Sequence, residues 1–409
     1  MLRSLSSRGI RQAPAIRSHL SVIGFLAVTL SLSVSASAEI VVGDGRAASC
    51  TELALRNALA SAQIDGGGTI RFQCGAAPVT IDLIAVGEDL RTTVGYPLPP
   101  AALNPPDHTT IDGGGLVTLQ GNAPFSTVVH IAAGRKVRLT GLVVTGGNVG
   151  VFNEGTLALS DSIVRDNAEH YLLYLTSGIF NDGALTVKNS TFLRNGNYAS
   201  SPAGGIFNWG TLTVDHSAFS GGRSGISGGI GNWGTLDIRN SVITDNFGEL
   251  AGGIGNIRGD ATIKNVDFSR NYSLLSGGIF NGASLTLENS TFLDNFAGEL
   301  PASGAIYNVS PTVTTIRNCE FFGNQGTWAG AIANHSPLIV SNSTFSGNHG
   351  YFYGGAIYTD DALTVRHSRV TENTAGINGA GIYADPGISP ILIHTSVTNN
   401  TPTDIIVHP

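Results

Sequence analysis

Three residues that could act as bases, acids or cation ligands recur at an interval of 25 residues. They are His335, Asp360 and Asp385, and Asp361 follows directly after the second of them. Two carboxylates about 5 Å apart can share a proton, bind Ca²⁺ or flank a glycosidic bond, and a nearby imidazole can accept a proton. The alternative interpretation is that all four are solvated turn residues, because Asp is common in turns.

Aromatic residues form a second pattern with chemical meaning. Trp209 and Trp233 stand 24 residues apart in the nearly identical phrases GGIFNWGTLTV and GGIGNWGTLDI, and Trp328, Tyr351 and Tyr353 follow later. Stacked aromatic rings on a surface make a flat apolar platform that suits the face of a sugar ring. These five residues are therefore candidate ligand-binding residues, with plain packing as the alternative interpretation.

A repeat of about 25 residues must position both patterns. The phrase Ile-x-Asn or its close variants recurs along the chain, and a second Asn follows within most repeats, as in STFLRN, STFLDN and STFSGN. The first Asn of each repeat falls at Asn153, Asn181, Asn208, Asn232, Asn256, Asn281, Asn308 and Asn334. A fixed period of this length is typical of a solenoid.

The residues within each repeat indicate which solenoid this is. Phrases such as TLTV, SLTL and ALTV alternate apolar and polar residues of β-favouring types, and only Gly, Ser and Asn lie between them. This predicts an all-β fold, a right-handed parallel β-helix of about 25 residues and three short strands per rung. Equivalent residues should then stack about 4.8 Å apart, with Asn ladders in the core and glycines that permit positive φ at the corners. Trp209 should lie over Trp233, and Asp360 over Asp385.

The N-terminal region differs from the repeats. Residues 1–38 combine a basic start, an apolar run over 21–34 and the small residues Ala36-Ser37-Ala38, which predicts a signal peptide cleaved after Ala38. The apolar run is short for a membrane span, which needs roughly 20 residues. We expect residues 39–100 to form an N-terminal cap and the first rungs, and residues 101–409 to form the β-helix.

Three cysteines are present. Cys50 and Cys74 flank one N-terminal segment, and an exported chain can oxidise them, so we expect a disulfide between them. Residues 50–62 have mostly helical apolar spacing and predict an amphipathic capping helix, which the disulfide would hold against the strand TIRFQC. Cys319 stands where sister repeats have Ser, and we interpret it as a small packed residue.

Charge and motifs exclude several classes of function. Cleavage after Ala38 leaves 18 basic and 29 acidic residues, a net charge of −11. This disfavours nucleic acid and anionic membranes as partners. The mature chain carries no further apolar run long enough to cross a bilayer. It has no zinc-ligand spacing, P-loop or dinucleotide fingerprint, so we expect no cofactor, apart from Ca²⁺ at Asp360, Asp361 and Asp385 if the chain is a lyase.

Two sets of phrases resemble known bacterial families. SCTELALRNALASA, GGTIRFQCG and TTIDGGG resemble the N-terminal region of secreted β-helix proteins with the Cys-Ser-Leu-Arg-Glu-Ala motif. Cys50 and Arg56 match this motif, while Asn57-Ala58 stands in place of Glu-Ala. GGAI at 354–357 and the repeated Phe-x-x-Asn resemble the repeats of the polymorphic outer-membrane proteins. The resemblance implies a pectin-lyase-like fold and a secreted or outer-membrane bacterial protein, often adhesive. These motifs are structural and say little about activity.

Two functions remain open at this point. We favour a secreted or cell-surface adhesin, binding protein or envelope protein without catalysis, whose partner is a polysaccharide or a host or cell-surface protein. The alternative is an enzyme acting on polysaccharides, either a pectate-lyase-like lyase or a glycoside hydrolase, with its site on the outer face of the β-helix. In that case His335, Asp360 and Asp385 are the candidate catalytic residues.

Overall fold

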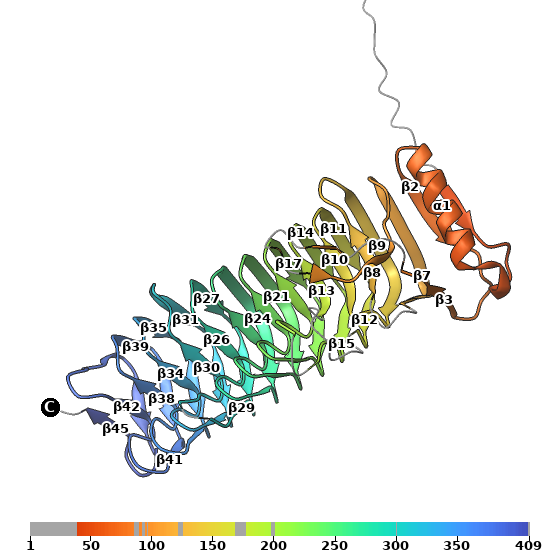
Figure 1. Ribbon diagram of the computed structural model, residues 1–409. Coiled ribbons are helices and arrows are strands. Elements are labelled where there is room, and N and C mark those ends of the chain that lie inside the picture. The colour runs from red at the N-terminus through yellow and green to blue at the C-terminus, as the bar shows by residue number, and fades with distance from the viewer. Residues whose placement is uncertain are drawn as a thin grey trace, which may run out of the picture. The chain divides into compact units, whose positions relative to one another are not determined.

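The computed structural model describes residues 39–85, 90–91, 95, 97–121, 126–167, 177–197, 201–299 and 301–407. The predicted signal peptide lies outside the described residues. Almost all described secondary structure is β-strand, wound into the coil of stacked rungs seen in Figure 1. Within the described residues, no helix has the length and hydrophobicity needed to cross a bilayer.

A helix lies at the N-terminal end of the coil. α1 (Glu52–Ile64) starts after Thr51, whose side chain accepts a hydrogen bond from the Ala54 amide, so the helix begins two residues later than the sequence predicted. Its buried side chains, Leu55, Ala58, Leu59 and Ala62, lie on one face. That face contacts β1 (Glu39–Val42), β2 (Gly68–Phe72) and β3 (Val79–Leu83) and so covers the first rung.

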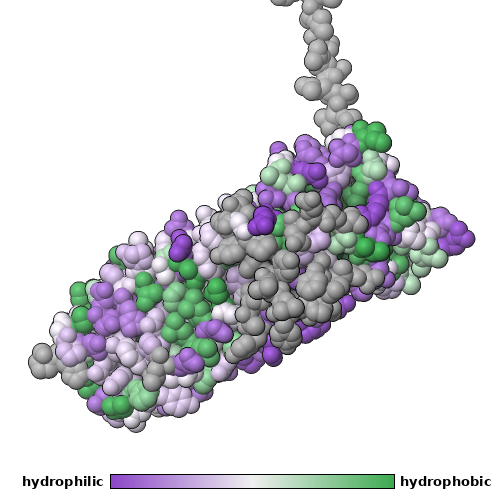
Figure 2. Space-filling view, viewed as in Figure 1, coloured by the Kyte–Doolittle hydropathy of each residue, from purple (hydrophilic) through white to green (hydrophobic). Residues whose placement is uncertain are grey.

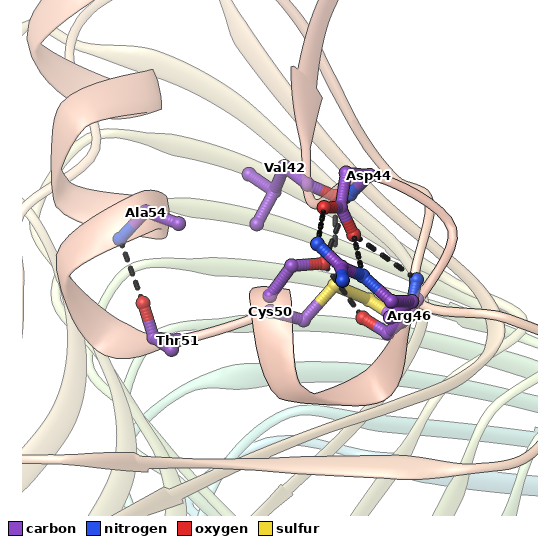
Figure 3. Close-up of a disulfide and its surroundings, with 8 residues drawn as sticks. Val42, Asp44, Arg46, Cys50, Thr51 and Ala54 are labelled. Carbon is purple, nitrogen blue, oxygen red and sulfur yellow. Dashed lines mark hydrogen bonds and ion pairs between the residues drawn. A yellow bond between two sulfur atoms is a disulfide. The ribbon is translucent and has the colours of Figure 1, made fainter.

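The predicted disulfide is present. Cys50 and Cys74 are joined with their Cα atoms 5.7 Å apart, and both side chains are buried. Figure 3 shows Cys50 beside Val42, next to the ion pair of Asp44 and Arg46. The bond links Cys50, two residues before the start of α1, to the loop after β2, and so fixes the helix to the first strands.

Each rung contributes one strand to a 13-stranded parallel sheet. From the first rung to the last, its strands are β6 (Ala101–Leu103), β8 (Thr127–Ile131), β10 (Val149–Asn153), β13 (Ser177–Asn181), β16 (Ile206–Asn208), β20 (Ile230–Asn232), β23 (Ile254–Asn256), β26 (Ile279–Asn281), β30 (Ile306–Asn308), β34 (Ile332–Asn334), β38 (Ile357–Thr359), β42 (Ile382–Ala384) and β45 (Ile405–Val407). This sheet carries the Ile-x-Asn phrases of the repeat.

The rest of each rung enters two other parallel sheets. A 23-stranded sheet contains β1, β2 and β3 together with β7 (Thr109–Gly121), β9 (Lys136–Thr145), β11 (Thr156–Ser160), β12 (Ile163–Arg165), β14 (Ala184–Lys188), β15 (Thr191–Leu193), β17 (Thr211–Asp215), β18 (Ala218–Ser220), β21 (Thr235–Thr244), β24 (Asp260–Ser269), β27 (Leu285–Glu288), β28 (Thr291–Leu293), β31 (Thr314–Arg317), β32 (Glu320–Phe322), β35 (Leu338–Ser341), β36 (Thr344–Ser346), β39 (Leu363–Arg366), β40 (Arg369–Thr371), β43 (Ile391–Ile393) and β44 (Ser396–Thr398). A 7-stranded sheet contains β19 (Arg223–Ser224), β22 (Phe247–Gly248), β25 (Tyr272–Ser273), β29 (Phe296–Ala297), β33 (Gln325–Gly326), β37 (His349–Gly350) and β41 (Thr374–Ala375). These two-residue strands add to the three per rung that the sequence predicted. Outside the coil, η1 (Ala47–Ser49) precedes α1, and β4 (Leu90–Arg91) pairs with β5 (Pro97–Leu98).

The predicted inward residues form the core. Ile206 lies opposite Ile230 in register, and Phe219 lies opposite Ile243, all fully buried. Further along the coil, Phe268, Phe292, Phe321 and Phe345 stack ring on ring, with neighbouring centroids 4.6, 4.9 and 4.5 Å apart. Adjacent rungs therefore bury the same kind of side chain against each other, which the period of the sequence predicts.

Both predicted Asn ladders are formed. In the first ladder each side-chain amide donates to the next Asn, as from Asn256 to Asn281 and from Asn281 to Asn308, both at 2.9 Å. In the second ladder Asn271 donates to the side-chain oxygen of Asn295 at 3.0 Å. All five side chains are buried, so the ladders supply hydrogen-bond partners to amide groups that would otherwise have none in the core.

The predicted role of glycine at the corners is confirmed at some of them, such as Gly221, Gly323 and Gly347, which have φ of 65°, 62° and 66°. Other corners with positive φ carry Asn, Asp, His or Arg, such as Asn289 (φ 51°) and Arg270 (φ 51°). The repeated Gly-Gly pairs instead lie where consecutive rungs approach closely. A Cβ on Gly253 would lie 2.5 Å from the carbonyl oxygen of Gly278 one rung on, so these positions need glycine for space.

Candidate functional site

The outward side of the 13-stranded sheet gathers the residues that sequence analysis singled out. In each Ile-x-Asn phrase the middle residue points away from the core. In rung order this outward column reads His130, Phe152, Phe180, Phe207, Gly231, Gly255, Phe280, Tyr307, Ala333, Tyr358 and Tyr383. Most of this column is buried, and only Phe280 and Tyr383 are partly exposed. We call this side of the sheet the outer face. Figure 2 shows hydrophobic residues gathered on the viewed side, over the region of β26 and β30 in Figure 1.

Trp209 and Trp233 stack as predicted, but they also pack on the protein. Their ring centroids are 6.0 Å apart with 21° between the planes, and the ring of Phe207 meets Trp233 edge-on at 4.8 Å. Both indoles are half-buried, and the indole nitrogen of Trp209 is buried without a hydrogen-bond partner. One face of each ring is therefore used within the pair, which leaves only part of each indole for a ligand.

An apolar groove of about 500 Å³ lies beside Trp233, where the outward column carries glycine. The turns after β20 and β23 contribute Trp233 and Ile257. An atom of the Trp233 ring lies 3.1 Å from where a Cβ on Gly231 would stand, and a side-chain carbon of Ile257 lies 3.4 Å from where a Cβ on Gly255 would stand. The loops before β20, β23 and β26 contribute the other apolar residues, which are Ile226, Leu250, Leu274 and Leu275. The phrase IGN in place of IFN is the sequence signal for this groove, and our sequence analysis missed it.

Two carboxylates lie at the groove. Glu249 and Glu299 both line it, and both side chains are exposed. The amide of Glu299 donates to the carbonyl of Leu274, and the amide of Leu274 donates to the carbonyl of Glu249, so the three residues stack on consecutive rungs. The two carboxylates therefore stand two rungs apart, about 10 Å at the usual spacing of strands.

A second group of side chains on the outer face contains the predicted acids and His335. The Nδ1 atom of His335 lies 2.7 Å from a carboxylate oxygen of Asp360, and the hydroxyl of Tyr358 donates to Asp385 at 2.8 Å. Asp361 instead accepts a hydrogen bond from the amide of Ala362. The structure thus brings three of the four residues together, and the tyrosine that engages Asp385 was not among the predicted candidates.

Aromatic rings enclose this group. Trp328 lies 4.8 Å from Tyr358 and 6.0 Å from His335, and Tyr353 lies 4.5 Å from Tyr383, between ring centroids. We call these rings, with His335, Asp360 and Asp385, the tyrosine cluster. Burial, and then the charge of Asp385, raise the pKa of Tyr383, and burial with the hydrogen bond to Asp385 raises that of Tyr358. Both phenols therefore stay protonated at neutral pH, and that of Tyr358 donates to Asp385.

The remaining candidate residues lie apart from one another. Tyr351 is half exposed and meets the ring of His349 edge-on, at the corner beyond the tyrosine cluster. In the part of the chain that the structure describes, no three His, Cys, Asp or Glu side chains converge as metal ligands. Asp360 and Asp385 are each engaged by a neighbouring side chain, and Asp361 by a backbone amide.

Comparison with known proteins agrees with this geometry at the level of fold. Residues 205–375 and 253–408 match the family described as the right handed beta helix region. The fold and these matches together define the class, a right-handed parallel β-helix protein. No curated protein sequence matches the chain.

Two solved structures are similar to this chain over most of its length. One is PfbA, a surface adhesin of Streptococcus pneumoniae, with 13% identity, a TM-score of 0.42 and coverage of 88% of this chain and 91% of that one. The other is the A-module of the mannuronan C-5 epimerase AlgE6 of Azotobacter vinelandii, with 13% identity, a TM-score of 0.38 and coverage of 90% and 97%. At these values neither likeness carries an argument about function.

Proposed function

We propose that this chain is a secreted or cell-surface protein that acts by binding, and that the outer face of the 13-stranded sheet is its recognition surface. The observation that carries the proposal is the apolar groove between Trp233 and Leu275. The apolar side chains that line it are only half-buried, and such a groove marks a place where a ligand can remove them from water. The Cys50–Cys74 disulfide supports an oxidising compartment outside the cytoplasm.

A specific arrangement favours the enzyme alternative as a second candidate. His335 and Asp360 form a hydrogen-bonded pair next to Tyr358 and Asp385, which is the kind of group that could move protons at a sugar ring. Against it, the His335 Nε2 atom is buried by the protein itself, and the groove is lined by residues of the preceding rungs, from Gly225 to Glu299. Binding without catalysis therefore remains the function that the geometry supports best.

One experiment separates the two candidates. Purified protein comprising residues 39–409 is incubated with neutral, uronate-containing and amino-sugar polysaccharides, with and without Ca²⁺. Retention of the protein, new reducing ends and unsaturated products are measured in parallel. We expect no products in any sample. Product formation that is lost in Asp360→Ala and Asp385→Ala would overturn the binding proposal in favour of a lyase or hydrolase.

The recognition surface itself is tested by substitution. The change Trp233→Ala removes an indole from the groove, and Ile163→Ala truncates an exposed apolar side chain on the 23-stranded sheet as the control. We expect binding of any retained ligand to weaken about tenfold or more in the first variant and to stay unchanged in the second. Equal loss in both, or in neither, would place the recognition surface elsewhere.

A further inference from the structure

We propose that the apolar groove receives a short segment of a partner protein, one that presents two or three neighbouring aliphatic or aromatic side chains flanked by Lys or Arg. The inference rests on the proposed function and names the partner's chemistry at the same surface. It is argued from the shape of the groove, the type of side chain that lines it and the charges at its rim.

The lining of the groove selects apolar side chains over sugars. Leu250, Leu274 and Leu275 are aliphatic, as are Ile226 and Ile257 on the neighbouring loops and turns. A sugar placed here would lose hydrogen bonds between its hydroxyls and water without gaining donors or acceptors from these residues. Leu, Ile or Phe side chains of a partner would instead exchange water for apolar contact, at about 25 cal/mol per Å² buried.

Size and rigidity set how much of a partner fits. A volume of about 500 Å³ lies within the usual range for ligand pockets and suits a few side chains better than a whole helix or strand. The loops that line the groove are stacked by backbone hydrogen bonds, from Leu250 to Ile226 at 3.0 Å and from Leu275 to Glu249 at 3.2 Å. The groove is therefore preformed, which reduces the ordering cost of binding.

The rim charges indicate a cationic partner. Some acids elsewhere in the coil are paired with bases on the next rung, as Asp166 is with Arg194 and Asp245 is with Arg270. Within the described residues, Glu249 and Glu299 form no ion pair, and neither does Arg258, the base nearest to the lining in sequence. Two unpaired carboxylates about 10 Å apart attract Lys or Arg side chains on either side of an apolar segment.

The same charges argue against other occupants. An anionic membrane or a uronate polymer would be repelled by both glutamates and by the net charge of −11 expected for the mature chain. A second copy of the chain would have to bring a basic apolar segment to the groove. A cationic amphipathic segment of another protein satisfies both the lining and the rim.

The experiment uses residues 39–409 and labelled peptides as probes. The test peptide carries leucines on one face and lysines on the other, and two comparison peptides carry glutamate in place of lysine or a scrambled order of the same residues. Amino-sugar, neutral and uronate oligosaccharides are measured under the same conditions by fluorescence anisotropy. The protein variants are Glu249→Lys with Glu299→Lys, and Leu250→Gln with Leu274→Gln.

Matched controls come from the other side of the coil. Glu320→Lys changes an exposed carboxylate, and Leu293→Gln changes an exposed leucine, both on the 23-stranded sheet. Because these residues lie away from the groove, a loss confined to the groove variants cannot come from net charge or surface polarity. Circular dichroism and thermal unfolding of each variant show whether the fold is kept.

The expected result is binding of the leucine–lysine peptide in preference to both comparison peptides. Binding should weaken about tenfold in each groove double variant, weaken with added salt, and stay unchanged in Glu320→Lys and Leu293→Gln. No binding of this peptide, or equal binding of the glutamate peptide, overturns the inference. If an oligosaccharide binds instead and Trp233→Ala removes it, the inference fails while the proposed function stands. If nothing binds, both fail.

Discussion

At the scale of the residue, the Asn ladders show how a core made of repeats tolerates polar side chains. Asn281 accepts from the Asn256 amide and donates to both Asn308 and Thr314, and none of these groups reaches water. Because each amide is both donor and acceptor, the ladder satisfies itself along the coil. Each Asn therefore matters for two rungs rather than for one.

Replacing Asn281 with Ala should lower the free energy of unfolding by about 1–3 kcal/mol, because the buried partner amides lose a hydrogen bond. The measurement is unfolding in guanidinium chloride followed by circular dichroism. Asn57→Ala, an exposed residue of α1, serves as the control and should leave the transition unchanged. If the two variants unfold at the same denaturant concentration, the ladder does not contribute as argued.

Cys319 occupies the position of a ladder serine and should be inert. The side chain is fully buried, burial raises the pKa of its thiol to about 12, and its Sγ atom lies 3.3 Å from the Arg317 carbonyl oxygen. We expect Ellman's reagent to leave the native protein unlabelled and to label one thiol after denaturation. Cys319→Ser should keep the unfolding midpoint. Rapid labelling of the native protein would contradict the packed position.

At the scale of the element, corners on consecutive rungs are linked by ion pairs. Arg270 donates two hydrogen bonds to the carboxylate of Asp245, at 2.8 and 2.9 Å, and these hydrogen bonds are the main cause that lowers the pKa of Asp245. The same arrangement joins Arg194 to Asp166. Since both residues of the first pair have positive φ, the pair also holds together two strained corners.

Acid should weaken this link. A carboxyl group with a lowered pKa in the folded state stabilises the fold above its unfolded pKa of about 4, and the contribution is lost as the pH falls toward the folded pKa. Thermal unfolding at pH 7 and pH 3 should therefore differ less in Arg270→Gln than in the unmodified protein. Because the pair is exposed, the effect should not exceed about 1 kcal/mol. An equal pH dependence in both proteins would contradict it.

Most of the coil could be predicted from the sequence because its rules are local and repeated. Ile230 under Ile206 and Asn281 under Asn256 follow from the period alone, and so does the approach of His335 to Asp360. The groove could not be predicted in this way, because it depends on how Trp233 and Ile257 lie over two glycines. The hydrogen bond from Tyr358 to Asp385 was missed for a similar reason, since it joins different positions of neighbouring repeats.

At the scale of the whole molecule, rungs are interchangeable units whose stability comes from their neighbours. Ile254 pairs with Ile279, so removal of residues 254–278 brings Ile279 into register against Ile230. Likewise Ile332 pairs with Ile357, so removal of residues 332–356 deletes one rung on the C-terminal side of the groove. The two deletions have the same length but remove different parts of the outer face.

Both shortened proteins should fold, with β-sheet circular dichroism and a cooperative thermal transition. The deletion of 254–278 removes Ile257, Leu274 and Leu275 and should abolish binding to the groove. The deletion of 332–356 removes His335 and should leave that binding intact. Loss of binding in both, with the fold preserved, would show that recognition needs the full length of the outer face.

The position of α1 has a consequence for how the molecule is made. Chain order begins at the N-terminus, so the helix can cover the first rung before later rungs form, and the Cys50–Cys74 bond fixes it once the chain reaches an oxidising compartment. Each new rung then finds a finished edge with the right spacing and needs contacts only about 25 residues back along the chain. Assembly in this order is templated, because each rung pairs with the one before it, and an error in an early rung therefore affects every rung that follows.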